Sequence, residues 1–316
     1  MSASVLRDEH APLLVIVGPT AVGKSALAIE LALALGGEII SADSMQVYRG
    51  FDIGTAKPTV TERAGVPHHL IDVVAPAERC SAADFVLRAE AALQAIRARG
   101  RQPIVVGGSG LYVRALLFGL FAAPAVDPVL RAAHRRDAEA EGTAALHRRL
   151  EGVDPAAAAR IHPHDFVRIS RALEVYEQTG QPISALRDAH GFAAARHAAR
   201  LVGLALAPDL LRERIERRVA QMLARGWIEE VRALCAAGHG ESHPMGGLGY
   251  RQLRDYLHGR LDLDQAMRQT RRETWRFARR QRNWFAHEAA VSWWDATAPP
   301  SVAAVRALLG PPGSGA

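Results

Sequence analysis

The chain has 316 residues, of which 49% are hydrophobic and 23% are charged, and its formal net charge at pH 7 is +6. That length allows one large domain or two ordinary ones, and the globular composition excludes disordered, collagen-like and coiled-coil chains. The early apolar run from Leu13 to Val17 follows the acidic Asp8 and Glu9 and is far shorter than the roughly 20 residues that cross a bilayer, so we expect neither a membrane span nor a signal peptide.

Predicted strands and helices alternate through the first part of the chain. Strands are predicted at Leu13 to Val17, Glu38 to Ser41, His69 to Asp72 and Ile104 to Val106, and helices at Ser25 to Leu35 and Ala82 to Arg99. Later in the chain, strands are predicted at Leu201 to Leu206 and Val291 to Trp294, with a helical stretch from Leu210 to Ala236 between them. This alternation indicates an α/β fold with a parallel sheet and helices on both faces.

The middle of the chain lacks strand signals. Asp127-Pro128 and Asp154-Pro155 each place a capping residue before a first-turn proline, and a helix is predicted from Asp165 to Thr179, with Val167 on its apolar side. We therefore expect residues 119–200 to form a helical insertion and residues 1–118 and 201–316 to form the catalytic core. The last dozen residues are expected to be a frayed tail.

The first predicted strand is followed by a phosphate-loop motif, GxxxxGK[ST]. It comprises Gly18, Pro19, Thr20, Ala21, Val22, Gly23, Lys24 and Ser25. The glycines allow backbone N–H groups to turn toward a phosphate chain, Lys24 neutralises its oxygens, and Ser25 can hold Mg²⁺. Lys24 and Lys57 are the two lysines of a chain that otherwise uses arginine. This bias indicates that each of them occupies a position that needs a compact ammonium group and not a planar guanidinium group.

A nucleotide kinase normally holds Mg²⁺ with an acid at the end of a second apolar strand. The strand from Ile104 to Val106 ends in glycines and Ser109 instead. Asp43 and Asp72 are the alternative acids at predicted strand ends. Asp43 could accept a proton or orient an amine, or it could cap a turn, and Asp72 could be a displaced metal ligand or a loop cap.

The two cysteines, Cys80 and Cys235, fit neither a disulfide framework nor a metal-binding spacing. A reducing cytoplasm is therefore the expected location.

Basic charge is concentrated in the later part of the chain. The first 110 residues hold 10 basic and 11 acidic residues, and the remainder holds 29 and 22. This asymmetry favours a polyanionic partner, although a solvated arginine-rich surface would give the same count.

One predicted helix carries much of this charge, because the segment from Arg268 to Arg282 contains seven arginines and one acid, Glu273. Five of these arginines recur at helical spacing and form what we call the arginine stripe: Arg268, Arg272, Arg276, Arg279 and Arg280. Such a stripe suits a phosphate backbone, whereas Trp275 and Trp284 are expected mainly to pack into the core.

Together these motifs closely resemble the bacterial tRNA dimethylallyltransferases, also called tRNA isopentenyltransferases, over nearly the whole chain. The resemblance is carried by GPTAVGKS from Gly18, ISADSMQVYRGFDIGTAKP from Ile40, SAADF from Ser81, VGGSGLY from Val106, ARIHPHD and RISRALEVY between Ala159 and Tyr176, GLGYRQ from Gly247 and ARRQRNWF from Ala278. The block from Asp43 to Pro58 is the part that separates this family from ordinary phosphate-loop kinases.

The resemblance implies transfer of a dimethylallyl group from dimethylallyl diphosphate to the exocyclic N6 amine of the adenosine 3′-adjacent to the anticodon of a tRNA, with release of diphosphate and a need for Mg²⁺. It also implies that the phosphate loop binds the donor, that Asp43 acts as the base, and that Ser109 lies beside the reacting groups. Lys24 and Arg218 would meet the diphosphate, and Ser25 would reach Mg²⁺ through it. A cytoplasmic monomer without membrane attachment is expected.

The resemblance further implies a set of tRNA-contacting positions, with the insertion meeting the anticodon stem-loop. These positions are Asp43, Ser44, Met45 and Gln46; Arg131; Val167, Arg168, Ile169, Ser170 and Arg171; Gly246, Gly247, Leu248, Gly249, Tyr250 and Arg251; and Arg279, Arg280, Gln281, Arg282, Asn283, Trp284, Phe285 and Ala286.

Three other functions stay open at this point. A small-molecule kinase would use the phosphate loop but lacks the usual strand-end acid. An RNA-binding GTPase or ATPase-like switch would carry a base-specificity motif such as NKxD, which the sequence does not contain. An adenylate isopentenyltransferase would act on a free nucleotide and would not need the helical insertion.

Overall fold

The computed structural model describes residues 12–191, 194–288 and 290–310 and divides into two compact units. The first unit comprises Met1–Leu117 and Arg196–Ala316, and the second comprises Phe118–Ala195. The second boundary lies before the predicted residue 200, because strand β5 of the first unit already begins at Ala199.

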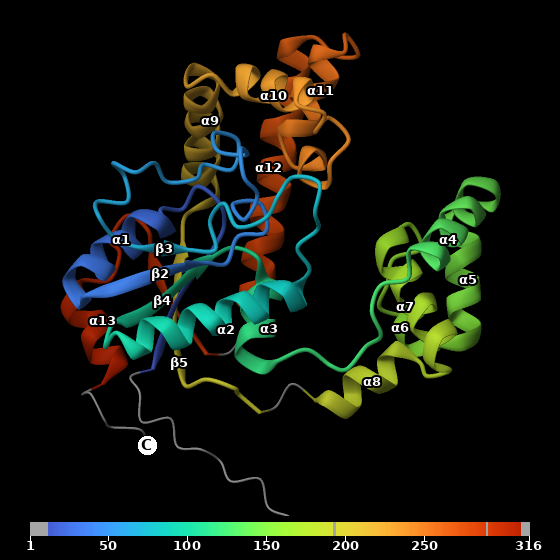
Figure 1. Ribbon diagram of the computed structural model, residues 1–316, viewed down its shortest axis with the longest axis horizontal. Helices are drawn as coiled ribbons and strands as arrows, with labels where there is room; N and C mark the ends of the chain where they lie inside the picture. Colours follow the sequence, from blue (N-terminus) through green and yellow to red (C-terminus); the bar gives the residue numbers. More distant parts are fainter. Residues whose placement is uncertain (1–11, 192–193, 289, 311–316) are drawn as a thin grey trace, which may run out of the picture. The chain divides into compact units, whose positions relative to one another are not determined.

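The first unit is built on a six-stranded parallel sheet in the order β3-β2-β4-β1-β5-β6, which confirms the expected fold class (Figure 1). Its strands are β1 (Leu13–Val17), β2 (Gly37–Ser41), β3 (His68–His69), β4 (Gln102–Gly107), β5 (Ala199–Ala205) and β6 (Val291–Asp295). Every residue of β1 is fully buried. Because β1 lies between β4 and β5, the loop that leaves its carboxyl end lies beside the ends of both neighbours.

Strand β3 is much shorter than the predicted strand from His69 to Asp72. Leu70 and Asp72 have φ angles of 63° and 60°, which an extended strand does not allow. The sequence pattern therefore gave the right place for this strand and the wrong length.

The helices of the first unit are α1 (Lys24–Leu35), α2 (Ala82–Ala98), α9 (Pro208–Ala224), α10 (Trp227–Ala236), η1 (His243–Gly246), α11 (Tyr250–Leu257), α12 (Leu263–Ala286) and α13 (Val302–Leu309), with α3 (Gly110–Phe118) at its boundary. Both α1 and α2 pack against β2 and β4, whereas α9, α10, α11 and α12 pack on one another (Figure 1). The predicted helical stretch from Leu210 to Ala236 is two helices, because Gly226 breaks it with a φ of 92°.

The carboxyl-terminal segment is only partly as expected. Residues Val302–Leu309 form helix α13, which Ser301 caps by accepting a hydrogen bond from the Ala304 amide. The predicted tail therefore begins later than residue 305, and its last residues, 311–316, lie outside the described part of the chain.

The second unit contains helices α4 (Pro128–Glu141), α5 (Thr143–Val153), α6 (Pro155–Ala158), α7 (Phe166–Thr179) and α8 (Ile183–His190). Asp127 and Asp154 cap α4 and α6 as their Asp-Pro sequences predict. Leu146, Leu150, Ile169 and Leu173 form a small core of this unit. The expectation for Val167 was wrong: this side chain is 70% exposed, because the buried side of α7 begins at Ile169.

Among the helices that the structure describes, none is both long enough and apolar enough to cross a membrane.

Candidate active site

The phosphate loop connects β1 to α1 with a backbone that only glycine accommodates at two positions. Gly18 has a φ of 141°, and a Cβ added there would lie 2.4 Å from the Leu204 carbonyl oxygen of β5. Gly23 has a φ of 105° and precedes α1, whose first turn is not capped by any side chain in the described ranges. The free N–H groups of that turn therefore provide a site for an anion.

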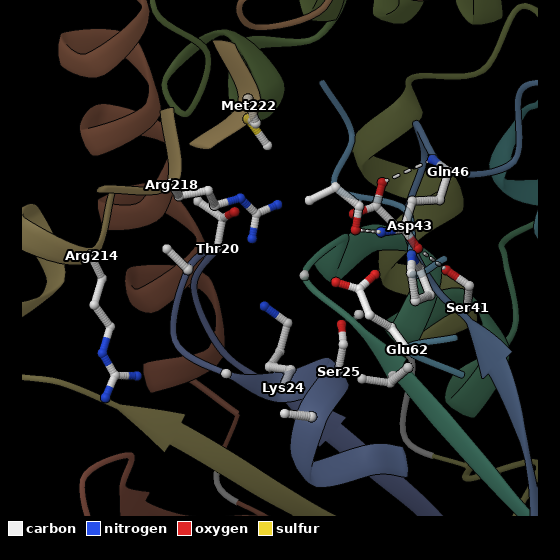
Figure 2. Close-up of a pocket in the computed structure, with 18 of the residues that line it drawn as sticks. Thr20, Lys24, Ser25, Ser41, Asp43, Gln46, Glu62, Arg214, Arg218 and Met222 are labelled. Atoms are coloured by element: carbon white, nitrogen blue, oxygen red, sulfur yellow. Dashed lines mark hydrogen bonds between the residues drawn. The ribbon is translucent and has the colours of Figure 1, made fainter. Parts of the chain in front are cut away.

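A cavity of about 730 Å³ opens in front of this loop (Figure 2). It is lined by the loop and α1, by the carboxyl ends of β2 and β4, by the segment from Ala56 to Glu62, and by α9 and α12. Lys24, Ser25, Asp43 and Arg218 all line it, so the fold brings these predicted site residues together from distant parts of the chain.

Lys24 and Arg218 lie on one side of the cavity (Figure 2). The pKa of Lys24 is lowered to about 7, mainly by burial and also by the positive charge of Arg218, while the charge of Asp43 opposes the shift. Burial also lowers the pKa of Arg218, again against the influence of Asp43. Two cationic groups held this close together are stabilised when an anion binds between them.

Asp43 lies on the other side, at the end of β2 (Figure 2). Its Oδ1 atom accepts hydrogen bonds from the backbone N–H groups of Met45 at 2.8 Å and Gln46 at 3.3 Å. Oδ2 accepts none from the described residues. Asp43 therefore caps the turn with Oδ1, as one of the two interpretations predicted, and Oδ2 is free to bind a substrate.

Ser109 lies beside this turn. Its Oγ accepts a hydrogen bond from the backbone N–H of Ser44 at 3.1 Å, and its own N–H donates to the Ala42 carbonyl oxygen. A Cβ at Gly107 would lie 2.1 Å from the same Ala42 oxygen. Gly107, the last residue of β4, therefore stands at the strand end where a kinase would have its acid, because the ends of β2 and β4 approach too closely there for a side chain.

The loop between Asp43 and Pro58 is held by side chains. Gln46 accepts from the Ser41 hydroxyl and donates to the carbonyl oxygens of Thr55 and Ala56. Glu230 of α10 accepts hydrogen bonds from the N–H groups of residues 52, 53 and 54, and from the Tyr250 hydroxyl at 2.6 Å. Burial and the Glu230 charge raise the pKa of Tyr250.

Lys57 fixes the far end of the same loop. Lys57 is 5% exposed, and its ammonium group donates to the Tyr48 carbonyl oxygen at 2.8 Å, to Asp52 at 2.6 Å and to Asp72 at 2.5 Å. All three N–H donors are thus used, which explains a lysine at this position. Asp72 is the ion partner of Lys57 and is not among the residues that line the cavity.

Gln281 of α12 joins the phosphate loop to the end of β4. Its Oε1 accepts from the Thr20 N–H at 2.8 Å, and its Nε2 donates to the Gly108 carbonyl oxygen at 3.0 Å. The ring of Trp284 lies against Gly110, where a Cβ would be 2.3 Å away, and it remains 37% exposed. The end of α12 is therefore part of the wall of this site.

The predicted tRNA contacts differ in how much side chain they present. Ile169, Ser170, Tyr250, Gln281 and Phe285 are buried, and so is Gly249. Exposed positions are Ser44, Val167, Arg168, Gly246, Arg251, Arg279, Arg280, Arg282, Asn283, Trp284 and Ala286, and the half-buried ones are Asp43, Met45, Gln46, Arg131, Arg171, Gly247 and Leu248. Arg131 and Arg171 form ion pairs with the fully buried Glu174, so both guanidinium groups have a structural role in the second unit.

The arginine stripe lies on the exposed side of α12. All five of its members are exposed, and none forms an ion pair with a described residue. Trp275 packs partly into the core, and the guanidinium carbon of Arg212 lies over its ring, 5.1 Å from the centroid. The stripe is therefore neither buried nor neutralised by neighbouring acids.

Sequence reasoning missed most of the α9 wall. Arg214, Arg217, Gln221, Met222 and Arg225 line the cavity together with Arg218. Their spacing of three or four residues along a helix could have identified them once Arg218 was singled out. Glu62 and Phe277 also line the cavity, and no pattern in the sequence marks either of them.

In the described ranges, no group of three or more histidine, cysteine, aspartate or glutamate side chains is arranged to hold a metal ion. The cavity does offer the Ser25 hydroxyl at the phosphate loop, while the Asp43 carboxylate lies across the cavity. That donor set suits a magnesium ion held mainly by substrate phosphate oxygens and water, as is common for Mg²⁺.

Comparisons with known proteins give a consistent result. The chain matches the IPP transferase family over residues 46–288. It is 52% identical to a tRNA dimethylallyltransferase of Sorangium cellulosum over 279 residues, covering 88% of this chain and 89% of the relative. It is 49% identical to one of Geobacter metallireducens, covering 90% and 93%.

Solved structures agree with these sequence matches. A full-length tRNA isopentenylpyrophosphate transferase of Bacillus halodurans aligns with a TM-score of 0.66 at 41% identity, covering 90% of each chain. A eukaryotic dimethylallyltransferase acting on tRNA aligns with a TM-score of 0.76 at 28% identity, covering 90% of this chain and 73% of that one.

Proposed function

The chain belongs to the IPP transferase family, and we propose that it transfers a dimethylallyl group from dimethylallyl diphosphate to the N6 amine of the adenosine 3′-adjacent to the anticodon in tRNA. The observation that carries this proposal is the cavity in which a phosphate loop, with Lys24 and Arg218, faces the Asp43 carboxylate. One side of it suits a diphosphate and the other suits an amine that must lose a proton.

On the donor side, the phosphate-loop N–H groups, Lys24 and Arg218 would hold the diphosphate. The bond between the first carbon of the dimethylallyl group and the diphosphate oxygen breaks, and its electron pair leaves with diphosphate. Negative charge therefore grows where these donors and cations are concentrated, which stabilises the transition state more than the bound donor.

On the acceptor side, the N6 lone pair forms the new carbon–nitrogen bond, and the free Oδ2 of Asp43 would accept the proton that the amine releases. A carboxylate is needed because this lone pair is delocalised into the purine ring. The adenine has to leave its stack to reach Asp43. Ser109, which is hydrogen-bonded to Ser44, would lie beside the reacting groups.

Magnesium is part of this proposal. Ser25 would reach the ion, and the remaining ligands would be diphosphate oxygens and water, consistent with the few carboxylates near the loop. When bound, the ion would neutralise charge on the departing diphosphate.

The RNA would meet exposed groups of both units. In the first unit these include the arginine stripe and the exposed end of α12, and in the second unit they include Val167 and Arg168. Among these groups the arginines can bind phosphate, and phosphate contacts position an RNA without reading its sequence. We further propose that the protein works as a monomer in the cytoplasm.

The deciding experiment is to incubate labelled dimethylallyl diphosphate with unmodified tRNA, with AMP and with ATP. We expect label in tRNA alone, at the adenosine 3′ of the anticodon. Label in AMP or ATP would identify an adenylate isopentenyltransferase instead. Stoichiometric ADP formation coupled to product formation would overturn the proposal in favour of a kinase.

A further inference from the structure

The α9 wall of the cavity contains more positive charge than the donor requires. Arg217 and Arg225 also line the cavity. Arg217 lies on α9 beside Arg218, and Arg225 is the residue that caps the carboxyl end of this helix. Arg218 is half-buried and close to both Lys24 and Asp43. Arg217 and Arg225 are exposed, and within the described part of the chain neither forms an ion pair.

Counting charges over the cavity shows the excess. Five cationic side chains line it, Lys24, Arg214, Arg217, Arg218 and Arg225, against two carboxylates, Asp43 and Glu62. A diphosphate monoester carries about three negative charges, and Mg²⁺ offsets two of them. The loaded donor therefore neutralises about one of the three excess positive charges, and about two remain.

Arg217 and Arg225 are the two cavity arginines that stay available for a further anion. Arg214 keeps its charge but is fixed in place, because its Nη1 donates to the Val22 carbonyl oxygen at 3.1 Å, and it lies apart from Lys24 and Arg218 (Figure 2). Glu62 accepts from the Thr59 N–H at 2.7 Å. That hydrogen bond is the main cause of its lowered pKa, and the Arg225 charge contributes only a smaller part.

We propose that Arg217 and Arg225 form a second anion subsite that binds the phosphodiester groups flanking the target adenosine. This inference rests on the proposed function, since an adenine that reaches Asp43 brings its own sugar and phosphates to the cavity. Each phosphodiester carries one negative charge, and the planar guanidinium group binds phosphate oxygens in pairs. Two flanking phosphodiesters match the two positive charges that the donor leaves unpaired.

The test compares the wild type with the double variant Arg217→Gln/Arg225→Gln and with a matched control, Arg88→Gln. Arg88 is an exposed arginine of α2 that does not line the cavity. We expect the double variant to bind an anticodon stem-loop RNA at least about 10-fold more weakly. Its slope of log affinity against log salt should be smaller by about 1.4, at roughly 0.7 per lost phosphate contact. The control should match the wild type in both measurements.

Donor binding separates this subsite from the diphosphate site. The dissociation constant for dimethylallyl diphosphate with Mg²⁺ should change less than about 2-fold in the double variant. If donor binding weakens as much as RNA binding, both arginines serve the diphosphate, and the inference is wrong.

A third arm separates RNA phosphates from free phosphate. Inorganic diphosphate is titrated into wild-type protein already saturated with the donor and Mg²⁺. A second bound equivalent that the double variant loses, together with an unchanged RNA salt slope, would overturn the RNA assignment.

Failure of the proposed function would look different. In that case the wild type would leave tRNA unlabelled, whatever the effect of the arginines on RNA affinity. A wild type that prenylates tRNA, with a double variant whose salt slope is unchanged, would instead reject the subsite alone.

Discussion

Two loops face each other across the cavity, and they are held in different ways. The phosphate loop from Gly18 to Ser25 takes its shape mainly from its own backbone and from the strand and helix that it joins, with one contact each from the side chains of Gln281 and Arg214. The loop from Asp43 to Pro58 takes its shape from side chains, two of its own, Gln46 and Lys57, and one from far along the chain, Glu230.

This difference separates two kinds of motif. In the phosphate loop the motif residues are the binding groups themselves. In the longer loop most motif residues bind other parts of the protein and thereby hold Asp43 and the cavity wall in place. A chain of hydrogen bonds runs from Glu230 to the N–H groups of residues 52–54, and from Thr55 and Ala56 through Gln46 to Asp43.

The largest effect is expected for Asp43→Asn. The asparagine oxygen can keep the two backbone hydrogen bonds of the turn, so the variant removes the charge and preserves the loop. The rate constant of prenyl transfer in a single-turnover assay should fall by roughly 10²- to 10⁴-fold. The dissociation constants for the donor and for tRNA should stay within a few-fold of the wild-type values. Near-normal turnover would leave Asp43 as a turn cap only.

Lys57→Arg tests whether the longer loop depends on a compact ammonium group. A guanidinium group cannot satisfy three acceptors within 2.8 Å in the same buried volume. We expect the free energy of unfolding in urea to fall by roughly 2 to 4 kcal/mol. The matched variant Lys24→Arg, at the open cavity, should lose clearly less free energy of unfolding. Equal losses would show that the two loops do not differ in this respect.

Glu230→Gln tests the hydrogen-bond chain directly. An amide offers one acceptor oxygen where the carboxylate offers two, so the N–H groups of residues 52–54 and the Tyr250 hydroxyl cannot all be satisfied. We expect kcat to fall about 10-fold with little change in the dissociation constant for diphosphate. Glu229→Gln, an exposed neighbour on α10, is the control. A parallel loss of diphosphate affinity would mean that Glu230 supports the whole cavity and not the Asp43 side alone.

The smallest effect concerns the phosphate loop. Lys24 has a pKa of about 7 in the free protein because burial and Arg218 disfavour its charged form. A bound diphosphate favours the charged form and raises this pKa, so binding takes up a proton above pH 7 and almost none at pH 6. Calorimetry of donor binding at pH 8 in buffers of different ionisation enthalpy should give an uptake of about 0.9 proton. Lys24→Arg should abolish it, and an equal uptake in that variant would assign the proton to another group.

Several features could be predicted from the sequence because each depends on local chemistry. The phosphate loop, its flanking strand and helix, and the Asp-Pro caps of α4 and α6 follow from glycine geometry, apolar periodicity and side-chain capping within a few residues. The position of Asp43 at a strand end also followed, since parallel strands present their carboxyl ends to one edge of the sheet.

Other features required the tertiary structure. Leu70 and Asp72 end β3 early through backbone angles that their residue types do not signal, and Val167 is exposed because packing of the second unit selects the other side of α7. The roles of Glu230 and Gln281, and the wall formed by Arg217 and Arg225, depend on contacts between elements separated by roughly 100 residues or more. A local pattern records which conformations a segment prefers. Which distant side chain completes a hydrogen bond or faces a cavity is decided only when the whole chain packs.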